Sequence, residues 1–185
     1  VVGLTTLISR ITGLWRDMVY SQAFGAGTVM DAFLVAYKIP NFLRRLFAEG
    51  AFSQSFVPVI SEYKVTKSQD EVRDLISGVS GTFGVVLLII TAIGVIAAPV
   101  LIFLFAPGFS RVGGKYELAV DMLRFTFPYL FFISLTALFS GVLNSYGRFA
   151  VPAFTQVIMN VVMIIFGTFV AVNSANPGLA LAVGV

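Results

Sequence analysis

The sequence contains no cysteine and no histidine among its 185 residues. It can therefore form no disulfide, and it offers no thiol nucleophile, no serine–histidine–aspartate triad and no histidine ligand for a metal. It also lacks a Walker A motif, and the glycine-rich turn at 25–27 has no third glycine to complete a dinucleotide-binding fingerprint. These absences exclude most enzyme classes. We expect a protein that is not an enzyme and that uses no cofactor and no metal.

Charged residues are also scarce. They make up 11% of the sequence, whereas 58% is hydrophobic and the mean hydropathy is +0.95. An ordinary soluble domain has about 25% charged residues, so this composition predicts a multi-pass membrane protein. The net charge of +3 comes from twelve basic residues spread thinly along apolar segments. Because they form no basic face, we expect no nucleic-acid partner and instead expect contact with anionic membrane lipids.

The apolar segments predict an all-α fold, a polytopic bundle of five complete transmembrane helices and part of a sixth. A span needs about 20 apolar residues, and the region 85–105 meets this length without a charge. The chain starts without methionine and stops inside an apolar run, so we expect a fragment of a longer protein. The approximate predicted spans are 1–24, 30–63, 80–106, 120–146, 151–172 and the incomplete 178–185.

Charges interrupt the first predicted span. Thr6, Arg10, Gly13 and Asp17 follow a spacing of i, i+4, i+7 and i+11, which places them on one helix face, while Arg16 lies off this stripe. A charge within a span costs roughly 2.5–3.5 kcal/mol even on insertion scales. One interpretation is that these side chains lie near a helix end and extend to the lipid headgroups. We favour a helix face that lines a water-filled interior.

The second predicted span carries the densest group of charges. Asp31 opens it, where a carboxylate either stabilises the helix N-terminus or serves a functional site. Pro40 predicts a kinked or broken helix, which is tolerated where the backbone lines a cavity. Arg45 and Glu49 are four residues apart and are expected to form a structural ion pair. Arg44 is then left to contact a ligand.

Two further patterns concern the fifth span and the orientation of the chain. Gln156 and Asn160 are four residues apart, and we favour hydrogen bonds across helices over ligand binding for both. By the positive-inside rule, the loops with more lysine and arginine are cytoplasmic, which places the N-terminal end in the cytoplasm. The loops after spans two and four carry Lys64, Lys67, Arg73 and Arg148, and those after the other spans carry Arg111 and Lys115.

Arginines in a membrane cavity favour an anionic ligand, because guanidinium stays charged and binds phosphate oxygens in a bidentate manner. A diphosphate is the expected class of ligand. Four runs also resemble the lipid II flippases of the MurJ/MviN type, in the multidrug/oligosaccharidyl-lipid/polysaccharide exporter superfamily. They are SRITGLWRD at 9–17, FGAGTVMDAF at 24–33, KIPNFLRRLFAEGAFSQSFVP at 38–58 and NSYGRFAVPAF at 144–154.

This resemblance implies a protein of two helical lobes, of which the chain would be most of the first, with the second lobe missing. It implies that lipid II, an undecaprenyl-diphosphate-linked disaccharide-peptide, is moved by alternating access from the inner to the outer leaflet of the bacterial cytoplasmic membrane. The cavity residues that it implies are Arg10, Arg16, Asp17, Asp31, Arg44 and Glu49.

Other functions remain open from the sequence. The protein could export another polyprenyl-diphosphate-linked oligosaccharide, or it could be a drug/cation antiporter of the same superfamily, although antiport of cationic drugs favours acidic cavity groups. A membrane-embedded phosphotransferase would need a metal-binding carboxylate cluster, for which Asp70, Glu71 and Asp74 are the candidates. A non-transporting scaffold would be expected to lose the cavity charges.

Overall fold

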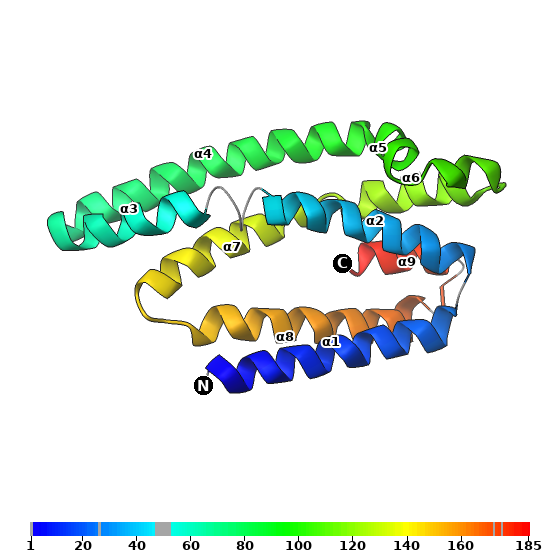
Figure 1. The fold of residues 1–185 in the computed structure, drawn as a ribbon, viewed down its shortest axis with the longest axis horizontal. Helices are drawn as coiled ribbons and strands as arrows, with labels where there is room; N and C mark the ends of the chain where they lie inside the picture. Colours follow the sequence, from blue (N-terminus) through cyan, green and yellow to red (C-terminus); the bar gives the residue numbers. More distant parts are fainter. Residues whose placement is uncertain (1, 26, 47–52, 172, 175) are drawn as a thin grey trace.

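The computed structural model describes residues 2–25, 27–46, 53–171, 173–174 and 176–185, and every regular element within them is helical (Figure 1). The predicted all-α fold class is thus confirmed. The α-helices are α1 (Val2–Phe24), α2 (Thr28–Arg44), α3 (Ser53–Thr66), α4 (Gln69–Ile96), α5 (Ala98–Phe105), α6 (Lys115–Thr126), α7 (Tyr129–Ser145), α8 (Ala150–Ile165) and α9 (Pro177–Val183). A 3₁₀ turn, η2 (Pro107–Arg111), precedes α6, and a π-helical turn, η3 (Phe166–Ala171), follows α8.

The helices pack as neighbours in an order that differs from their order along the chain. Helix α1 lies along α8, and α2 packs against α6, α7 and α9 (Figure 1). Helices α3 and α4 pack against each other and against α7. Helix α7 also contacts α8 and therefore connects the two groups. Residues from α1, α2, α7 and α8 can consequently surround one space, although they are far apart in the sequence.

The main core lies where α2 crosses α6. Ala32 and Ala36 are completely buried on α2, and Phe33 between them is 2% exposed. Small side chains allow the two helices to approach closely, which is common in membrane proteins. At this crossing the Thr126 hydroxyl donates a hydrogen bond of 2.9 Å to the carbonyl of Ala36. One face of α2 is therefore fixed in the core, and its opposite face is available for another role.

Three described stretches are long and apolar enough to cross a membrane: Gln69–Ile96, Lys115–Ser145 and Ala150–Val170. Many large apolar side chains on α4 are exposed, among them Val85, Leu88, Ile89 and Ile93. Such a surface would be unstable in water, but it is the normal surface of a helix that faces lipid. The fold is therefore that of a polytopic membrane helix bundle.

The polar stretch at 64–74 is more regular than the sequence suggested. We assigned Lys64, Lys67 and Arg73 to the loop after the second predicted span, but α3 continues to Thr66 and α4 begins at Gln69. Ser68 caps α4 through a capping box, in which the Glu71 carboxylate accepts hydrogen bonds of 3.0 Å from the Ser68 amide and hydroxyl. Glu71 also lies 3.5 Å from Lys67. This carboxylate therefore has a structural role in helix capping.

The second predicted span corresponds to α2 and α3. Helix α2 continues through Pro40 and ends at Arg44, and α3 begins at Ser53. Pro40 is buried in this helix. Glu49 lies outside the described residues, and so does its predicted ion pair with Arg45.

Candidate functional site

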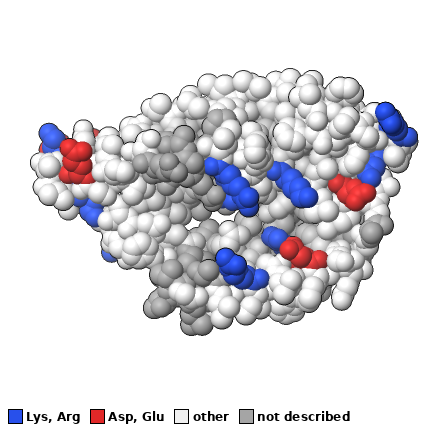
Figure 2. Space-filling view, viewed as in Figure 1, with Lys and Arg blue, Asp and Glu red and all other residues white. Residues whose placement is uncertain are grey.

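A cavity of about 580 Å³ lies between α1, α2, α7 and α8. Its most distinctive feature is positive charge, because four basic side chains contribute to its wall: Arg16, Lys38, Arg44 and Arg45. We call it the cationic cavity. Figure 2 shows lysine and arginine side chains gathered around a hollow in this face of the molecule. The other lining residues are Tyr37, Asn41, Phe42, Tyr129, Gln156 and Met159.

Helical periodicity explains how α2 contributes so many of these side chains. Tyr37, Asn41, Arg44 and Arg45 are related by spacings of i, i+4, i+7 and i+8, which place them on one face of the helix. Lys38 lies beside this face. The opposite face is held in the core against α6, so that the basic side chains must face away from it. The core packing of α2 therefore orients the cavity wall.

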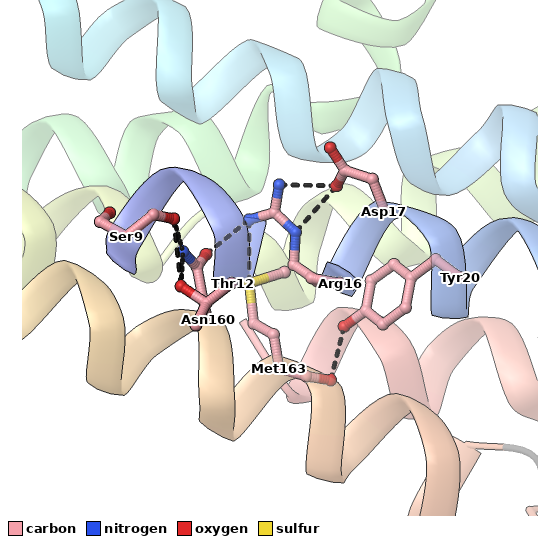
Figure 3. Close-up of polar contacts among 7 residues, drawn as sticks. All are labelled: Ser9, Thr12, Arg16, Asp17, Tyr20, Asn160 and Met163. Carbon is pink, nitrogen blue, oxygen red and sulfur yellow. Dashed lines mark hydrogen bonds and ion pairs between the residues drawn. The ribbon is translucent and has the colours of Figure 1, made fainter. Parts of the chain in front are cut away.

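Arg16 is the contribution of α1, and hydrogen bonds hold its guanidinium in place (Figure 3). Its Nε and Nη2 donate to Asp17 Oδ1 at 2.9 and 2.7 Å. Its Nη1 donates to Asn160 Oδ1 on α8 at 3.1 Å. The Arg16 side chain is 17% exposed, whereas that of Asp17 is 65% exposed. The guanidinium is thus fixed between its own helix and α8.

Asn160 connects α1 to α8. It is 2% exposed, and its Nδ2 donates to the Ser9 carbonyl at 3.1 Å and to Thr12 Oγ1 at 3.2 Å (Figure 3). The predicted hydrogen bonding of Asn160 across helices is therefore confirmed. Gln156, one turn earlier, instead lines the cationic cavity. Asn160 therefore has a structural role between α1 and α8, whereas Gln156 belongs to the cavity wall.

Tyrosines support both sides of the cavity. The Tyr20 hydroxyl donates a 2.9 Å hydrogen bond to the Met163 carbonyl, a second link between α1 and α8 (Figure 3). The Tyr129 hydroxyl of α7 donates to Asn41 Oδ1 on α2 at 3.3 Å, and its ring centroid lies 6.0 Å from that of Tyr37. These contacts hold α1 to α8 and α2 to α7, the two pairs of helices that form the wall.

The structure brings together only some of the residues that the sequence singled out. Arg16 and Arg44 both line the cationic cavity. Arg10 is exposed and is not among the described residues that line it. Asp17 contacts the cavity wall indirectly, through its ion pair with Arg16. Asp31 lies in the first turn of α2, and its carboxylate is 2.6 Å from Lys115 Nζ of α6.

Sequence reasoning missed several residues of the wall. Lys38 and Arg45 are seven residues apart on α2, so helical spacing could have placed both beside Arg44. Tyr37, Asn41 and Tyr129 gave no comparable signal, because their relevance depends on where α2 and α7 cross. The arrangement can bind an anion with several oxygen atoms, since guanidinium and ammonium groups from different helices point into one space.

Comparisons with known proteins point to one family. The family model for the lipid II flippase MurJ matches residues 20–185. A probable lipid II flippase MurJ of Vibrio cholerae is 47% identical to the chain over 192 residues, covering 100% of the chain and 37% of that protein. The lipid II flippase MurJ of Burkholderia cenocepacia is 46% identical over 177 residues, covering 96% of the chain and 34% of that protein.

A solved structure is also similar. A lipid II flippase MurJ in an inward closed conformation superimposes with a TM-score of 0.79 and is 34% identical, covering 99% of the chain and 39% of that structure. The chain therefore spans little more than a third of the length of each relative, a share consistent with one lobe of a two-lobed exporter. The matching family model, the sequence identity and the shared fold lead to one conclusion: this chain belongs to the MurJ family of lipid II flippases.

Proposed function

We propose that the protein to which this chain belongs moves lipid II from the inner to the outer leaflet of the bacterial cytoplasmic membrane. The observation that carries this proposal is the cationic cavity, in which Arg16, Lys38, Arg44 and Arg45 converge from two helices. Lipid II carries a diphosphate between its lipid and its sugar, and this diphosphate is the group that such a cavity would bind. Family membership supports the choice of cargo.

The sign of the charge supports an anionic cargo over a cationic one. The described residues that line the cavity include four basic side chains and no aspartate or glutamate. Cations that are held close together repel one another, and a bound diphosphate removes this repulsion. A drug/cation antiporter would gain nothing from such a wall. An exporter of another polyprenyl-diphosphate-linked oligosaccharide remains the alternative, because its cargo carries the same diphosphate.

We assign different roles to the basic residues. Arg16 and Arg44 would bind the diphosphate, since they approach the cavity from α1 and α2, and Lys38 and Arg45 would add positive charge beside them. Asp17 would hold Arg16 in a productive orientation through the ion pair of 2.7 Å.

The remaining predicted site residues would act less directly. Arg10 would extend the polar face of α1 beyond the cavity, because it is exposed on that helix. Asp31 would act through Lys115, by fixing the start of α2 to α6. Glu49 follows the basic residues of α2 in the sequence, and we retain it as a proposed cavity residue on the family resemblance alone.

The proposed cycle is transport by alternating access and involves no bond-breaking chemistry. The second lobe of the same protein would supply the other wall of the cavity. The excess of lysine and arginine around the connections after the second and fourth predicted spans would put these connections, together with the N-terminal end, on the cytoplasmic side.

The proposal is tested by depleting the full-length protein from its bacterium and measuring lipid II in each leaflet. We expect lipid II to accumulate in the inner leaflet and its outer-leaflet pool to fall before growth stops. Expression of an unrelated lipid II flippase should restore both pools. Loss of drug resistance with unchanged lipid II pools would contradict the proposal and favour a drug antiporter.

A further inference from the structure

A second groove continues from the cationic cavity between α7 and α8. It has a volume of about 310 Å³ and shares Arg44, Gln156 and Met159 with the cavity. We call it the neutral groove, because Arg44 at the junction is the one charged side chain among the described residues that line it. Its other polar lining residues are Thr136, Ser140, Asn144 and Thr155.

The hydrogen-bonding groups of the neutral groove suit a ligand that is rich in hydroxyl groups. The Thr136 hydroxyl donates to the Phe132 carbonyl at 2.8 Å, and the Thr155 hydroxyl donates to the Val151 carbonyl at 3.1 Å. Each threonine donor is thus used within its own helix, and the oxygen lone pairs remain to accept hydrogen bonds from a ligand.

Ser140 and Asn144 offer both donors and acceptors. Their side chains make no hydrogen bond with the part of the chain that the structure describes, and both residues line the groove. Gln156 offers the same combination at the junction with the cavity. A sugar hydroxyl both donates and accepts, so it would satisfy all of these groups. An anion could accept from Ser140, Asn144 and Gln156, but it could not donate to the threonine oxygens.

Apolar side chains complete the groove. Ile133, Ala137 and Pro152 lie among the polar lining residues. A pyranose ring presents C–H groups on its faces and hydroxyl groups around its edge, and it therefore matches a surface that alternates apolar and neutral polar groups. A purely hydrocarbon chain would give no hydrogen bonds to the Ser140 hydroxyl or to the Asn144 and Gln156 amides.

The connection between the two spaces limits what can occupy the groove. In a polyprenyl-diphosphate-linked oligosaccharide, the first sugar is bonded directly to the diphosphate and must lie beside it. We propose that the neutral groove binds this first sugar while the cationic cavity holds the diphosphate. The inference rests on the proposed function. Arg44 would then lie at the junction of sugar and diphosphate, and the groove would distinguish a glycosylated carrier lipid from the bare one.

The test measures binding of three lipids to the full-length protein in lipid nanodiscs. The probes are undecaprenyl diphosphate, the same lipid carrying one N-acetylhexosamine on its diphosphate, and lipid II. The groove variant combines Thr136→Val, Ser140→Ala and Thr155→Val. The control variant combines Thr66→Val and Ser61→Ala, because these exposed hydroxyls donate to their own helix in the same way but lie outside the groove.

We expect the groove variant to weaken binding of both glycosylated lipids roughly 10-fold or more, since each neutral hydrogen bond changes Kd by about 2- to 10-fold. Binding of undecaprenyl diphosphate should change less than about 2-fold, which also shows that the variant is folded. The control variant should bind all three lipids like wild type.

Three results would overturn the inference. An equal loss for all three lipids would show that the groove variant disturbs the whole cavity. A loss for lipid II alone would show that the groove binds the second sugar or the peptide instead of the first sugar, and no loss for any lipid would show that the groove is not used. Failure of the wild type to bind any of them would contradict the proposed function as well.

Discussion

At the scale of single residues, the position of Arg16 depends on partners that are distant in the sequence. Its guanidinium contacts Asn160 of α8, 144 residues away, as well as its neighbour Asp17. Helical spacing placed Arg10 and Asp17 on a polar stripe and left Arg16 off it. The structure shows that the residue off the stripe lines the cavity, because α1 packs against α8 on that side. Arg10 and Asp17 are not among the described residues that line the cationic cavity, so the spacing did not identify the cavity-facing side of α1.

Replacing Asn160 should weaken both the packing of α1 on α8 and the orientation of Arg16. Asn160→Ala removes the acceptor for Arg16 and both hydrogen bonds to α1. We expect the free energy of unfolding to fall by about 1–3 kcal/mol, because buried polar groups lose their partners. Thermal unfolding of the purified full-length protein measures the change.

Asn173→Ala is the matched control. Asn173 is exposed, and its Nδ2 donates to the Phe169 carbonyl on its own segment. Its replacement should change the free energy of unfolding by less than about 0.5 kcal/mol. Equal effects of the two substitutions would contradict the bridging role of Asn160.

At the scale of elements, the close approach of α4 to the junction between α6 and α7 depends on one glycine. A Cβ atom at Gly94 would lie 1.9 Å from Cε1 of Phe127. Phe127 is 1% exposed and cannot move aside easily. Gly94→Ala should therefore lower the free energy of unfolding by about 1–3 kcal/mol through overpacking.

Gly78 on the same helix provides the comparison. A Cβ atom there would meet nothing within 4 Å. Gly78→Ala should leave stability unchanged or raise it by about 0.5–1 kcal/mol, because alanine favours a helix over glycine. Both values come from thermal unfolding in the same detergent. If the two alanines destabilised the protein equally, the proposed contact between Gly94 and Phe127 would be wrong.

The ion pair between Asp31 and Lys115 should connect α2 to α6. Lys115 Nζ lies 2.6 Å from Asp31 Oδ2, and the Lys115 side chain is 13% exposed. It also lies 4.4 Å from the centroid of the Phe109 ring. A double-mutant cycle with Asp31→Asn and Lys115→Met should give a coupling of about 0.5–1 kcal/mol that decreases with added salt.

The exposed pair of Asp121 and Arg124 is the control for this cycle. Their side chains are 52% and 48% exposed, and the closest atoms are 3.4 Å apart. The same kind of cycle should give a coupling near zero. A coupling for Asp31 and Lys115 no larger than this would mean that Asp31 does not fix α2 to α6.

The outcomes at this scale show what a sequence can and cannot predict. The long apolar run of α4 was evident from composition alone. The capping box at Ser68 and Glu71 was also present in the sequence, although we assigned Lys67 and Arg73 on either side of it to a loop. The partner of Asp31 could not be predicted, because Lys115 is 84 residues away and no local pattern connects them. Local signals specify helices, whereas pairing between helices depends on the fold.

At the scale of the whole molecule, we propose that the chain forms one wall of a site that a further part of the full-length protein completes. The chain spans 37% and 34% of two of its relatives, and Figure 2 shows basic side chains around a hollow in the surface of the described residues. Sequence composition predicted the membrane bundle, and the arginines of the first two predicted spans led to the prediction of an anionic cargo. Helical spacing could have placed Lys38 and Arg45 beside Arg44. Their grouping with Arg16 could not be predicted, because it depends on how α1 packs relative to α2, α7 and α8.

The central claim is that Arg16 and Arg44 bind the diphosphate of the cargo, and complementation tests it most directly. Cells depleted of the full-length protein would receive Arg16→Ala, Arg44→Ala or the control Arg124→Ala at equal expression. Arg124 is exposed and lies outside the cavity. We predict that the cavity variants fail to restore growth and outer-leaflet lipid II, whereas the control restores both. Full rescue by Arg16→Ala and Arg44→Ala would contradict the claim.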